Sequence, residues 1–195
     1  MRSPNFMSSK TDREIRLATE KVSSMITNIN TQVKRGNFLY VQLQISPNSV
    51  NETNFTTKGI YQDTYSNILN DSNIKIERKI QNSKYWDEHK VETTSKNVAV
   101  HFDADSSVCF SKDGSKFLKE GKLKSNINLK IAGEEKADYL ILCAPRNAEK
   151  TGNKCATDPR KVGKPSYGKP SYLVLWTRFG TVKKYKWSGS DWNLQ

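Results

Sequence analysis

The stretch from Thr11 to Gly36 (TDREIRLATEKVSSMITNINTQVKRG) constrains the fold of this chain more than any other. Its apolar residues recur at spacings of three and four, which places them on one side of an α-helix. They are Ile15, Ala18, Val22, Met25, Ile26, Ile29 and Val33. Leu17 points roughly the other way. With a rise of 1.5 Å per residue, the helix from Asp12 to Arg35 is about 36 Å long, so the sequence predicts a helical spine against which the rest of the chain packs.

Both ends of this predicted helix carry sequence signals. Thr11 and Glu14 form a T-x-x-E capping box, in which each side chain satisfies a backbone N–H of the first turn. Lys34 and Arg35 suit the negative end of the helix dipole, and Gly36 can adopt the left-handed conformation that ends many helices. The helix is therefore expected to begin at Thr11 and to end at Gly36.

The residues before Thr11 are expected to lie outside the folded part. Met1 to Phe6 (MRSPNF) precedes a second methionine, Met7, which is typical of a remnant left by a cloning vector. Residues 1–10 are therefore interpreted as such a remnant with a disordered lead-in, and residues 11–195 as a single globular domain.

The composition favours a modest core and a basic surface. Apolar residues make up 35% of the chain, and 32 basic against 20 acidic side chains give a net charge of +12. Such a charge suits a nucleic acid, an anionic membrane surface or plain solubility. No run in the sequence approaches the roughly 18 apolar residues of a membrane-spanning helix.

Residues 37–195 are typical of a β-rich region. The strand from Phe38 to Ile45 is expected to end at Pro47, and the residues from Ser46 to Gly59 are expected to form polar turns. The next stretch, Ile60 to Leu69, is open between a short helix and a strand. Further strands are predicted at Ile74–Ile80, Val98–Phe102, Val108–Phe110, Ile127–Ile131, Tyr139–Cys143, Tyr172–Phe179 and Val182–Trp187.

Turn residues predict how some of these strands pair. An Asp-Ala-Asp-Ser turn lies between the strands that end at Phe102 and begin at Val108, and it predicts a hairpin. Gly180 and Thr181 predict another hairpin near the end of the chain. Alternation along its last strand sets Val182, Lys184 and Lys186 against Lys183, Tyr185 and Trp187.

One long helix followed by strands in meander order predicts an α+β fold. The amphipathic helix would bury its apolar side on a twisted antiparallel sheet. A long basic loop, Ala144 to Ser171, precedes the C-terminal hairpin. Cys143 and Cys155 bracket part of this loop and would form a disulfide in an oxidising compartment.

Several features of this layout occur together in a known family. The helix combines Glu14 near its start, Ala18, the apolar period from Val22 to Val33 and the basic finish Lys34-Arg35-Gly36. VAVHFDADSS carries a strand end at Phe102-Asp103, and in LVLWTRFGTVKKYKW a glycine precedes a basic strand. In these respects the chain resembles type IV pilins and type II secretion pseudopilins, and among them the H-type minor pseudopilins and FimT-like minor pilins.

The resemblance implies a non-enzymatic subunit, with no cofactor, metal or small-molecule substrate, that assembles with other pilin subunits into a type IV pilus or a type II-like secretion pseudopilus. It also implies that an apolar segment ahead of the helix anchors the precursor in the bacterial inner membrane, and that the domain lies in the periplasm or outside the cell. The helix residues named above would then form the packing side, and Leu17 is a candidate contact with a neighbouring subunit.

The C-terminal hairpin offers an alternative function, because its cations interleave with aromatic residues in a pattern suited to phosphates and stacked bases. Some FimT-like minor pilins are associated with DNA uptake through a basic Gly-Arg-x-Arg motif near this place. The corresponding residues here are Gly180-Thr181-Val182-Lys183, with Thr181 in place of the first arginine. The candidate DNA-binding residues are Arg160, Lys161, Lys164, Lys169, Arg178, Lys183, Lys184 and Lys186.

Two further interpretations remain open. Trp176 and Trp187 would be cross-strand neighbours in the core, with the lysines protecting a sheet edge from aggregation. Alternatively, the chain is a basic α+β binding module of unknown partner. The sequence predicts no enzyme, since His89 and His101 lack a serine or cysteine partner at any motif spacing.

Overall fold

The computed structural model describes most of the predicted helix and many of the predicted strands. The described residues are 5–36, 38–49, 52–61, 87–93, 98–101, 107–111, 129–136, 139–143, 170–177 and 180–195. The predicted strand at Ile74–Ile80, the ambiguous stretch after Tyr61 and most of the long basic loop lie outside them.

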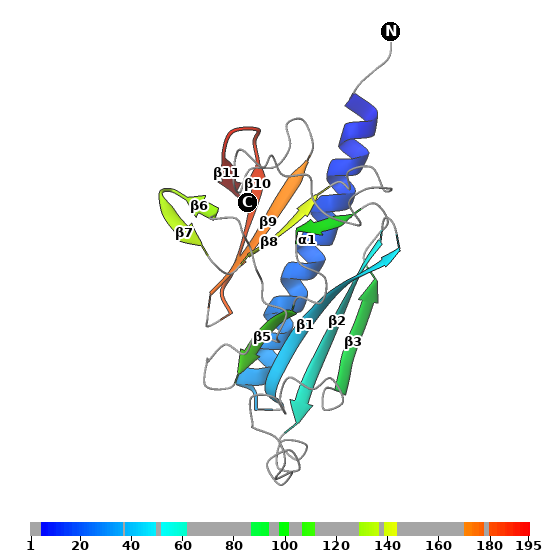
Figure 1. The fold of residues 1–195 in the computed structure, drawn as a ribbon, viewed down its shortest axis with the longest axis vertical. Coiled ribbons are helices and arrows are strands. Elements are labelled where there is room, and N and C mark those ends of the chain that lie inside the picture. The colour runs from blue at the N-terminus through cyan, green and yellow to red at the C-terminus, as the bar shows by residue number, and fades with distance from the viewer. Residues whose placement is uncertain are drawn as a thin grey trace.

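A single long helix, α1 (Asn5–Lys34), runs through the molecule (Figure 1). It begins at Asn5 rather than at Thr11, so Thr11 and Glu14 do not cap its first turn, and the expectation of a disordered lead-in is wrong for residues 5–10. The segment from Asn5 to Lys10 contains no glycine or proline to stop the helix, and Asn5 is itself a favoured capping residue.

The C-terminal end of α1 follows the prediction. Gly36 has a φ of 82°, in the left-handed region. Its N–H donates to the carbonyl oxygen of Val33 at 3.2 Å, and the N–H of Arg35 donates to that of Thr31 at 3.0 Å. Glycine adopts this conformation without the steric cost that a Cβ atom would bring.

A four-stranded antiparallel sheet packs on one side of α1, in the order β3-β2-β1-β5 (Figure 1). Its strands are β1 (Phe38–Ser49), β2 (Glu52–Tyr61), β3 (Asp87–Thr93) and β5 (Ser107–Ser111). Two expectations are wrong here, because β1 continues past Pro47 and β2 occupies the stretch interpreted as polar turns. The register shifts between Pro47 and Ser49, an irregularity at which proline is tolerated in a strand.

The second sheet has five strands in the order β11-β10-β9-β8-β4, all antiparallel. They are β4 (Ala99–His101), β8 (Tyr139–Cys143), β9 (Ser171–Trp176), β10 (Val182–Trp187) and β11 (Trp192–Leu194). The C-terminal hairpin β9–β10 is confirmed. The hairpin predicted between β4 and β5 is wrong, because β4 pairs with β8 and β5 pairs with β1. Turn residues predict that the chain changes direction, but they do not predict which strands pair with each other.

A small ribbon stands beside the five-stranded sheet (Figure 1). It consists of β6 (Leu129–Ile131) and β7 (Glu134–Lys136), paired antiparallel. Ala132 and Gly133 between them have φ values of 51° and 83°, and positive φ at both central residues is the signature of a tight hairpin turn. The turn at Gly133 therefore joins β6 to β7, a strand that the sequence analysis did not predict.

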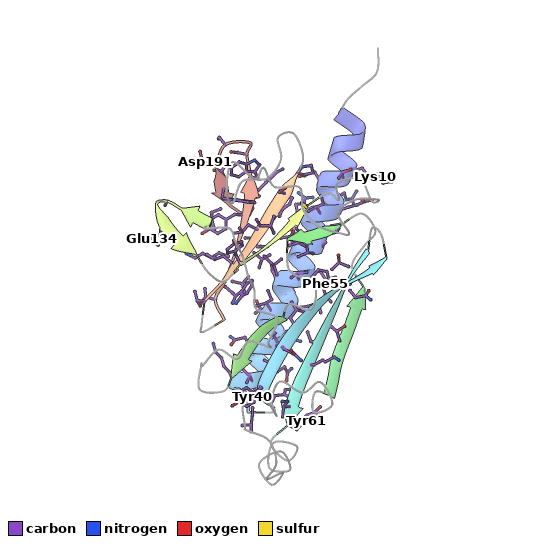
Figure 2. All side chains as sticks on the ribbon, in the orientation of Figure 1. Lys10, Tyr40, Phe55, Tyr61, Glu134 and Asp191 are labelled. Atoms are coloured by element: carbon purple, nitrogen blue, oxygen red, sulfur yellow. The ribbon has the colours of Figure 1, made fainter. Side chains whose placement is uncertain are left out.

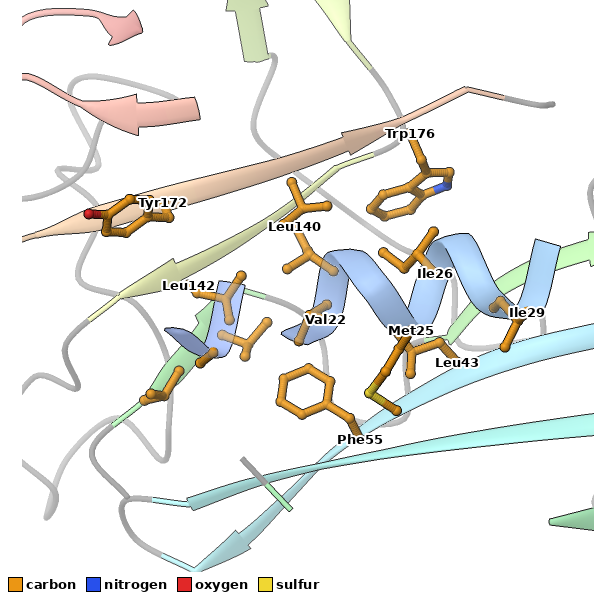
Figure 3. Packing of buried hydrophobic residues seen from close by; sticks show 14 of the residues in the cluster. Val22, Met25, Ile26, Ile29, Leu43, Phe55, Leu140, Leu142, Tyr172 and Trp176 are labelled. Carbon is orange, nitrogen blue, oxygen red and sulfur yellow. The ribbon is translucent and has the colours of Figure 1, made fainter. Parts of the chain in front are cut away.

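One hydrophobic cluster joins α1 to both sheets. In Figure 3, Met25 lies toward Phe55 and Leu43 of the four-stranded sheet, while Ile26 lies toward Leu140 and Trp176 of the five-stranded sheet. The hydroxyl of Thr53 in β2 also donates to the carbonyl oxygen of Val98 at 3.2 Å. The fold is thus α+β, with the inward sides of α1 buried between two antiparallel sheets.

The ends of α1 lie at opposite ends of the molecule. Figure 1 shows the first turns of the helix extending beyond the strands, and Figure 2 places Lys10 at that end and Tyr40 and Tyr61 at the other. In Figure 1 the five-stranded sheet lies toward the N-terminal end of the helix and the four-stranded sheet toward its C-terminal end, and both reach the helix at Met25 and Ile26. The helix is therefore the element common to both halves of the molecule.

Candidate functional site

The apolar side of α1 is buried in the core of the domain. All seven residues predicted for the packing side are buried, and none has more than 3% of its surface exposed: Ile15, Ala18, Val22, Met25, Ile26, Ile29 and Val33. Leu17 is 51% exposed, on the side away from the core, as its position off the stripe predicts. Of the helix residues proposed to meet a neighbouring subunit, Leu17 is therefore the one whose side chain is presented to solvent.

The C-terminal hairpin presents two apolar faces. Tyr172, Val174 and Trp176 of β9 belong to the cluster around α1, and Val182 of β10 packs against it. The residues that alternate with them, Leu173 and Leu175 of β9 and Tyr185 of β10, belong to a second cluster on the far face of the sheet. The predicted alternation along β10 is confirmed.

The expectation that Trp176 and Trp187 are cross-strand neighbours is wrong. Trp176 pairs with Val182, whereas Trp187 pairs with Trp192 of β11, a strand that the sequence analysis missed. The rings of Trp187 and Trp192 meet edge to face, with centroids 5.1 Å apart. Strand parity places Trp176 on the helix side of the sheet and Trp187 on the far side.

The candidate DNA-binding cations do not gather on one face in the part of the chain that the structure describes. Lys183 is exposed on the far face of β10, while Lys184 and Lys186 alternate onto the helix side and are partly covered. The remaining candidates, Arg160, Lys161, Lys164, Lys169 and Arg178, lie outside the described residues.

Lys186 is engaged in a three-residue polar contact with α1. Its Nζ lies 3.2 Å from Oδ1 of Asp12, and the hydroxyl of Tyr172 donates to the same oxygen at 3.0 Å. Nζ also lies 5.6 Å from the centre of the Tyr172 ring. Tyr172 and Lys186 are directly paired residues of neighbouring strands, so their side chains leave one face of the sheet side by side and converge on one carboxylate.

The proton affinities of two of these groups follow from the contact. Burial raises the pKa of the Tyr172 hydroxyl, and the hydrogen bond to Asp12 and its negative charge raise it further, against the opposing charge of Lys186. Burial lowers the pKa of Lys186, but the hydrogen bond to Asp12 and the charges of Tyr172 and Asp12 outweigh it and raise the pKa above 10.5. The contact therefore favours the protonated form of both groups.

The sequence analysis missed Asp12, although its position carries a signal. Asp12 precedes the buried residues Ile15 and Thr19 by three and by seven, the spacings that keep residues on one side of a helix. An acidic residue on the buried side of an amphipathic helix predicts a polar partner on the surface that the helix covers. Which partner that is depends on strands far away in the sequence.

A second contact joins the hairpin to the helix farther along. Gly180, in the turn between β9 and β10, has a φ of 82°, and a Cβ atom added there would overlap the side chain of Asn30 in α1. Asn30 is only 7% exposed, so it has little room to move aside. The turn therefore packs its backbone directly on the helix, which explains the glycine.

The structure describes one of the two cysteines of the predicted disulfide. Cys143, the last residue of β8, is disulfide-bonded. Cys155 lies outside the described residues, so its role as the partner stays a prediction.

Two other features bear on function. Among the described side chains, no group of three or more His, Cys, Asp or Glu residues could hold a metal ion. In the same part of the chain, no helix combines the length and the apolar character needed to cross a membrane.

Comparison with known protein families, curated proteins and solved structures finds no match for this chain.

Proposed function

We propose that this chain is the globular part of a minor pilin or type II secretion pseudopilin, a non-enzymatic subunit mounted on a filament through α1. The observation that carries the proposal is the position of this helix. The part from Ile15 to Val33 is the core element to which both sheets attach, while its first turns extend past the strands (Figure 1). A helix so placed is suited to connect a β-rich head to another structure.

The proposed mode of assembly follows from the resemblance of the helix and the final hairpin to those of pilins. An apolar segment ahead of α1 would anchor the precursor in the bacterial inner membrane and later pack among the corresponding segments of other subunits. The head would lie in the periplasm or outside the cell. The disulfide at Cys143 supports this placement, because disulfides form and persist in oxidising compartments.

Leu17 is the residue through which α1 would touch a neighbouring subunit. It is 51% exposed, and the buried residues of α1 that surround the core are unavailable for such a contact. Among the described side chains of α1, Leu17 is the one large apolar side chain that is exposed.

The proposal is tested in the bacterium that encodes the chain, with the complete gene product. We expect the genomic sequence upstream of the codon for Met7 to encode a short basic leader and an apolar segment of about 20 residues. We also expect the protein in the filament fraction released by shearing, or in periplasmic pseudopili. A gene product that begins at Met1 or at Met7, or a protein missing from both fractions, would refute the proposal.

A pair of variants tests the role of Leu17. Leu17→Glu is expected to lower recovery in the filament fraction while the isolated domain keeps its stability. Leu194→Glu is the matched control, because Leu194 is 62% exposed but lies on β11, the edge strand of the five-stranded sheet. Equal recovery of the two variants would show that Leu17 makes no subunit contact.

A further inference from the structure

The attachment of α1 to the sheets changes character along its length. From Ile15 onward the inward side of the helix is apolar and buried. By contrast, none of the described side chains from Lys10 to Glu14 is buried. Among the described side chains of this segment, Asp12 contacts the five-stranded sheet through its carboxylate. The contact that Asp12 makes is polar, so water can replace it, whereas the helix from Ile15 onward is held by the burial of apolar surface.

The polar contact has the geometry of a latch. Asp12 Oδ1 receives the Tyr172 hydroxyl at 3.0 Å and faces Lys186 Nζ at 3.2 Å. Because one oxygen atom receives both groups, the loss of the Asp12 charge weakens both contacts at once. The side chains of Lys186 and Asp12 are 42% and 27% exposed, so solvent reaches the ion pair and competes with it.

Four hydroxyl side chains beyond this segment bond back to carbonyl oxygens of the helix. Thr19 donates to the carbonyl oxygen of Ile15 at 2.8 Å, and Ser23 donates to that of Thr19 at 2.8 Å. Thr27 and Thr31 do the same, each bonded to the carbonyl four residues before it. Such bonds compete with the helical amide for the same carbonyl oxygen and often bend helices. Of these four bonds, the one to the carbonyl oxygen of Ile15 lies nearest to Asp12, about one turn beyond it.

We infer that residues 5–14 of α1 form a movable arm, that Asp12, Tyr172 and Lys186 form the latch that holds it on the five-stranded sheet, and that the arm pivots at the turn from Ile15 to Thr19. With the latch closed, the helix is continuous and lies along the sheet. With the latch open, the arm leaves the sheet while the buried part of the helix, from Val22 onward, stays in the core. The inference holds whatever α1 is mounted on, so it does not depend on the proposed function.

The test measures the position of the arm by the distance between two site-specific spin labels. One label replaces Lys10, which is exposed on the arm, and the other replaces Asp191, which is exposed beside β11; Figure 2 shows both at the same end of the molecule. A reference pair joins Asp191 to Ser24, an exposed residue beyond the pivot. The wild-type chain is expected to give a narrow distance distribution for both pairs.

Three variants open the latch in different ways: Asp12→Asn removes the charge, Tyr172→Phe removes one hydroxyl, and Lys186→Gln removes the cation. Each is expected to raise the ratio of detached to attached arm about two- to tenfold, the range that follows from losing one hydrogen bond or one partly exposed ion pair. This appears as a broader and shifted distribution for the pair that includes residue 10, with the reference pair unchanged. Lys184→Gln is the matched control on the same face of β10 and is expected to change neither.

Two results would overturn the inference. If the distribution of distances between the labels at residues 10 and 191 stays narrow in Asp12→Asn and in Lys186→Gln, then Asp12, Tyr172 and Lys186 do not hold the arm on the sheet. If the reference pair broadens equally, the residues support the whole domain rather than an arm. The double variant Asp12→Asn with Lys186→Gln distinguishes a shared latch from two separate contacts, because a shared latch predicts an effect smaller than the product of the single effects.

Discussion

Replacing Gly180 with alanine is expected to destabilise the domain through two separable effects. The first is conformational, because Gly180 has a φ of +82° and a residue with a Cβ atom loses about 1–2 kcal/mol in that region. The second is steric, because the new Cβ would overlap the side chain of Asn30, which is 7% exposed. Overpacking of this kind costs about 1–3 kcal/mol, so the total is about 2–5 kcal/mol.

The chain provides a matched control for the first effect. Gly133 has a φ of +83°, but a Cβ atom there would meet nothing within 4 Å. Gly133→Ala therefore reports the conformational cost without the overlap. The difference in the free energy of unfolding between the two variants, read from urea titrations with unchanged slope, should equal the steric cost of about 1–3 kcal/mol.

A double variant completes the test. In an Asn30→Ala background the obstacle is gone, so the addition of Gly180→Ala should cost no more than Gly133→Ala does. The coupling between the two positions is expected to be about 1–3 kcal/mol, within the range for residues in contact. If Gly180→Ala and Gly133→Ala destabilise the protein equally, or if the cost of Gly180→Ala is unchanged without Asn30, the packing of this turn on α1 does not explain the glycine.

Three further predictions concern the core, the latch and the exposed Lys183 of β10. Ile26→Ala, at a fully buried position between the two sheets, should lower the free energy of unfolding by about 2–5 kcal/mol, whereas Leu17→Ala should change it by no more than about 0.5 kcal/mol; equal urea midpoints would show that α1 is not the shared core. Because the pKa values of Tyr172 and Lys186 are raised in the folded state, the stability that the latch contributes is fully present below their unfolded values and is lost as the pH rises through the folded ones, above about pH 10. Urea midpoints measured from neutral to alkaline pH should therefore fall more steeply for the wild type than for Lys186→Gln, and parallel curves would contradict this. If the head binds DNA, Lys183→Glu should weaken binding and reduce its salt dependence, while Glu20→Gln, an exposed change on the helix, should not; unaltered binding in Lys183→Glu would remove β10 from the interface.

The local elements of this fold were largely predictable because their causes are local. The three-and-four spacing from Ile15 to Val33 requires a helix with one buried side, and all of these residues are buried. Gly36 predicted the end of α1, and its positive φ confirms the reason. The alternation along β10 likewise predicted which side chains share a face, since strand geometry has a period of two.

Prediction from the sequence was wrong where the structure of a segment depends on a contact with a distant part of the chain. The Asp-Ala-Asp-Ser turn suggested a hairpin, but β4 and β5 find partners in different sheets. The stretch that forms β2 is rich in polar residues and was interpreted as turns. In the structure Thr53 and Thr57 of β2 are buried against the core, where long-range strand pairing satisfies their backbone groups.

The sequence by itself determined that α1 has one apolar side, where it ends, and that a basic, β-rich region follows. Only the tertiary structure decided that two sheets share this helix, that Lys186 is turned toward Asp12 rather than into a continuous cationic surface, and that Gly180 rests on Asn30. The physical reason is that helical and strand periodicity arise from neighbours within a few residues, whereas a salt bridge or a close backbone contact requires residues more than a hundred positions apart to be brought together by the burial of the core.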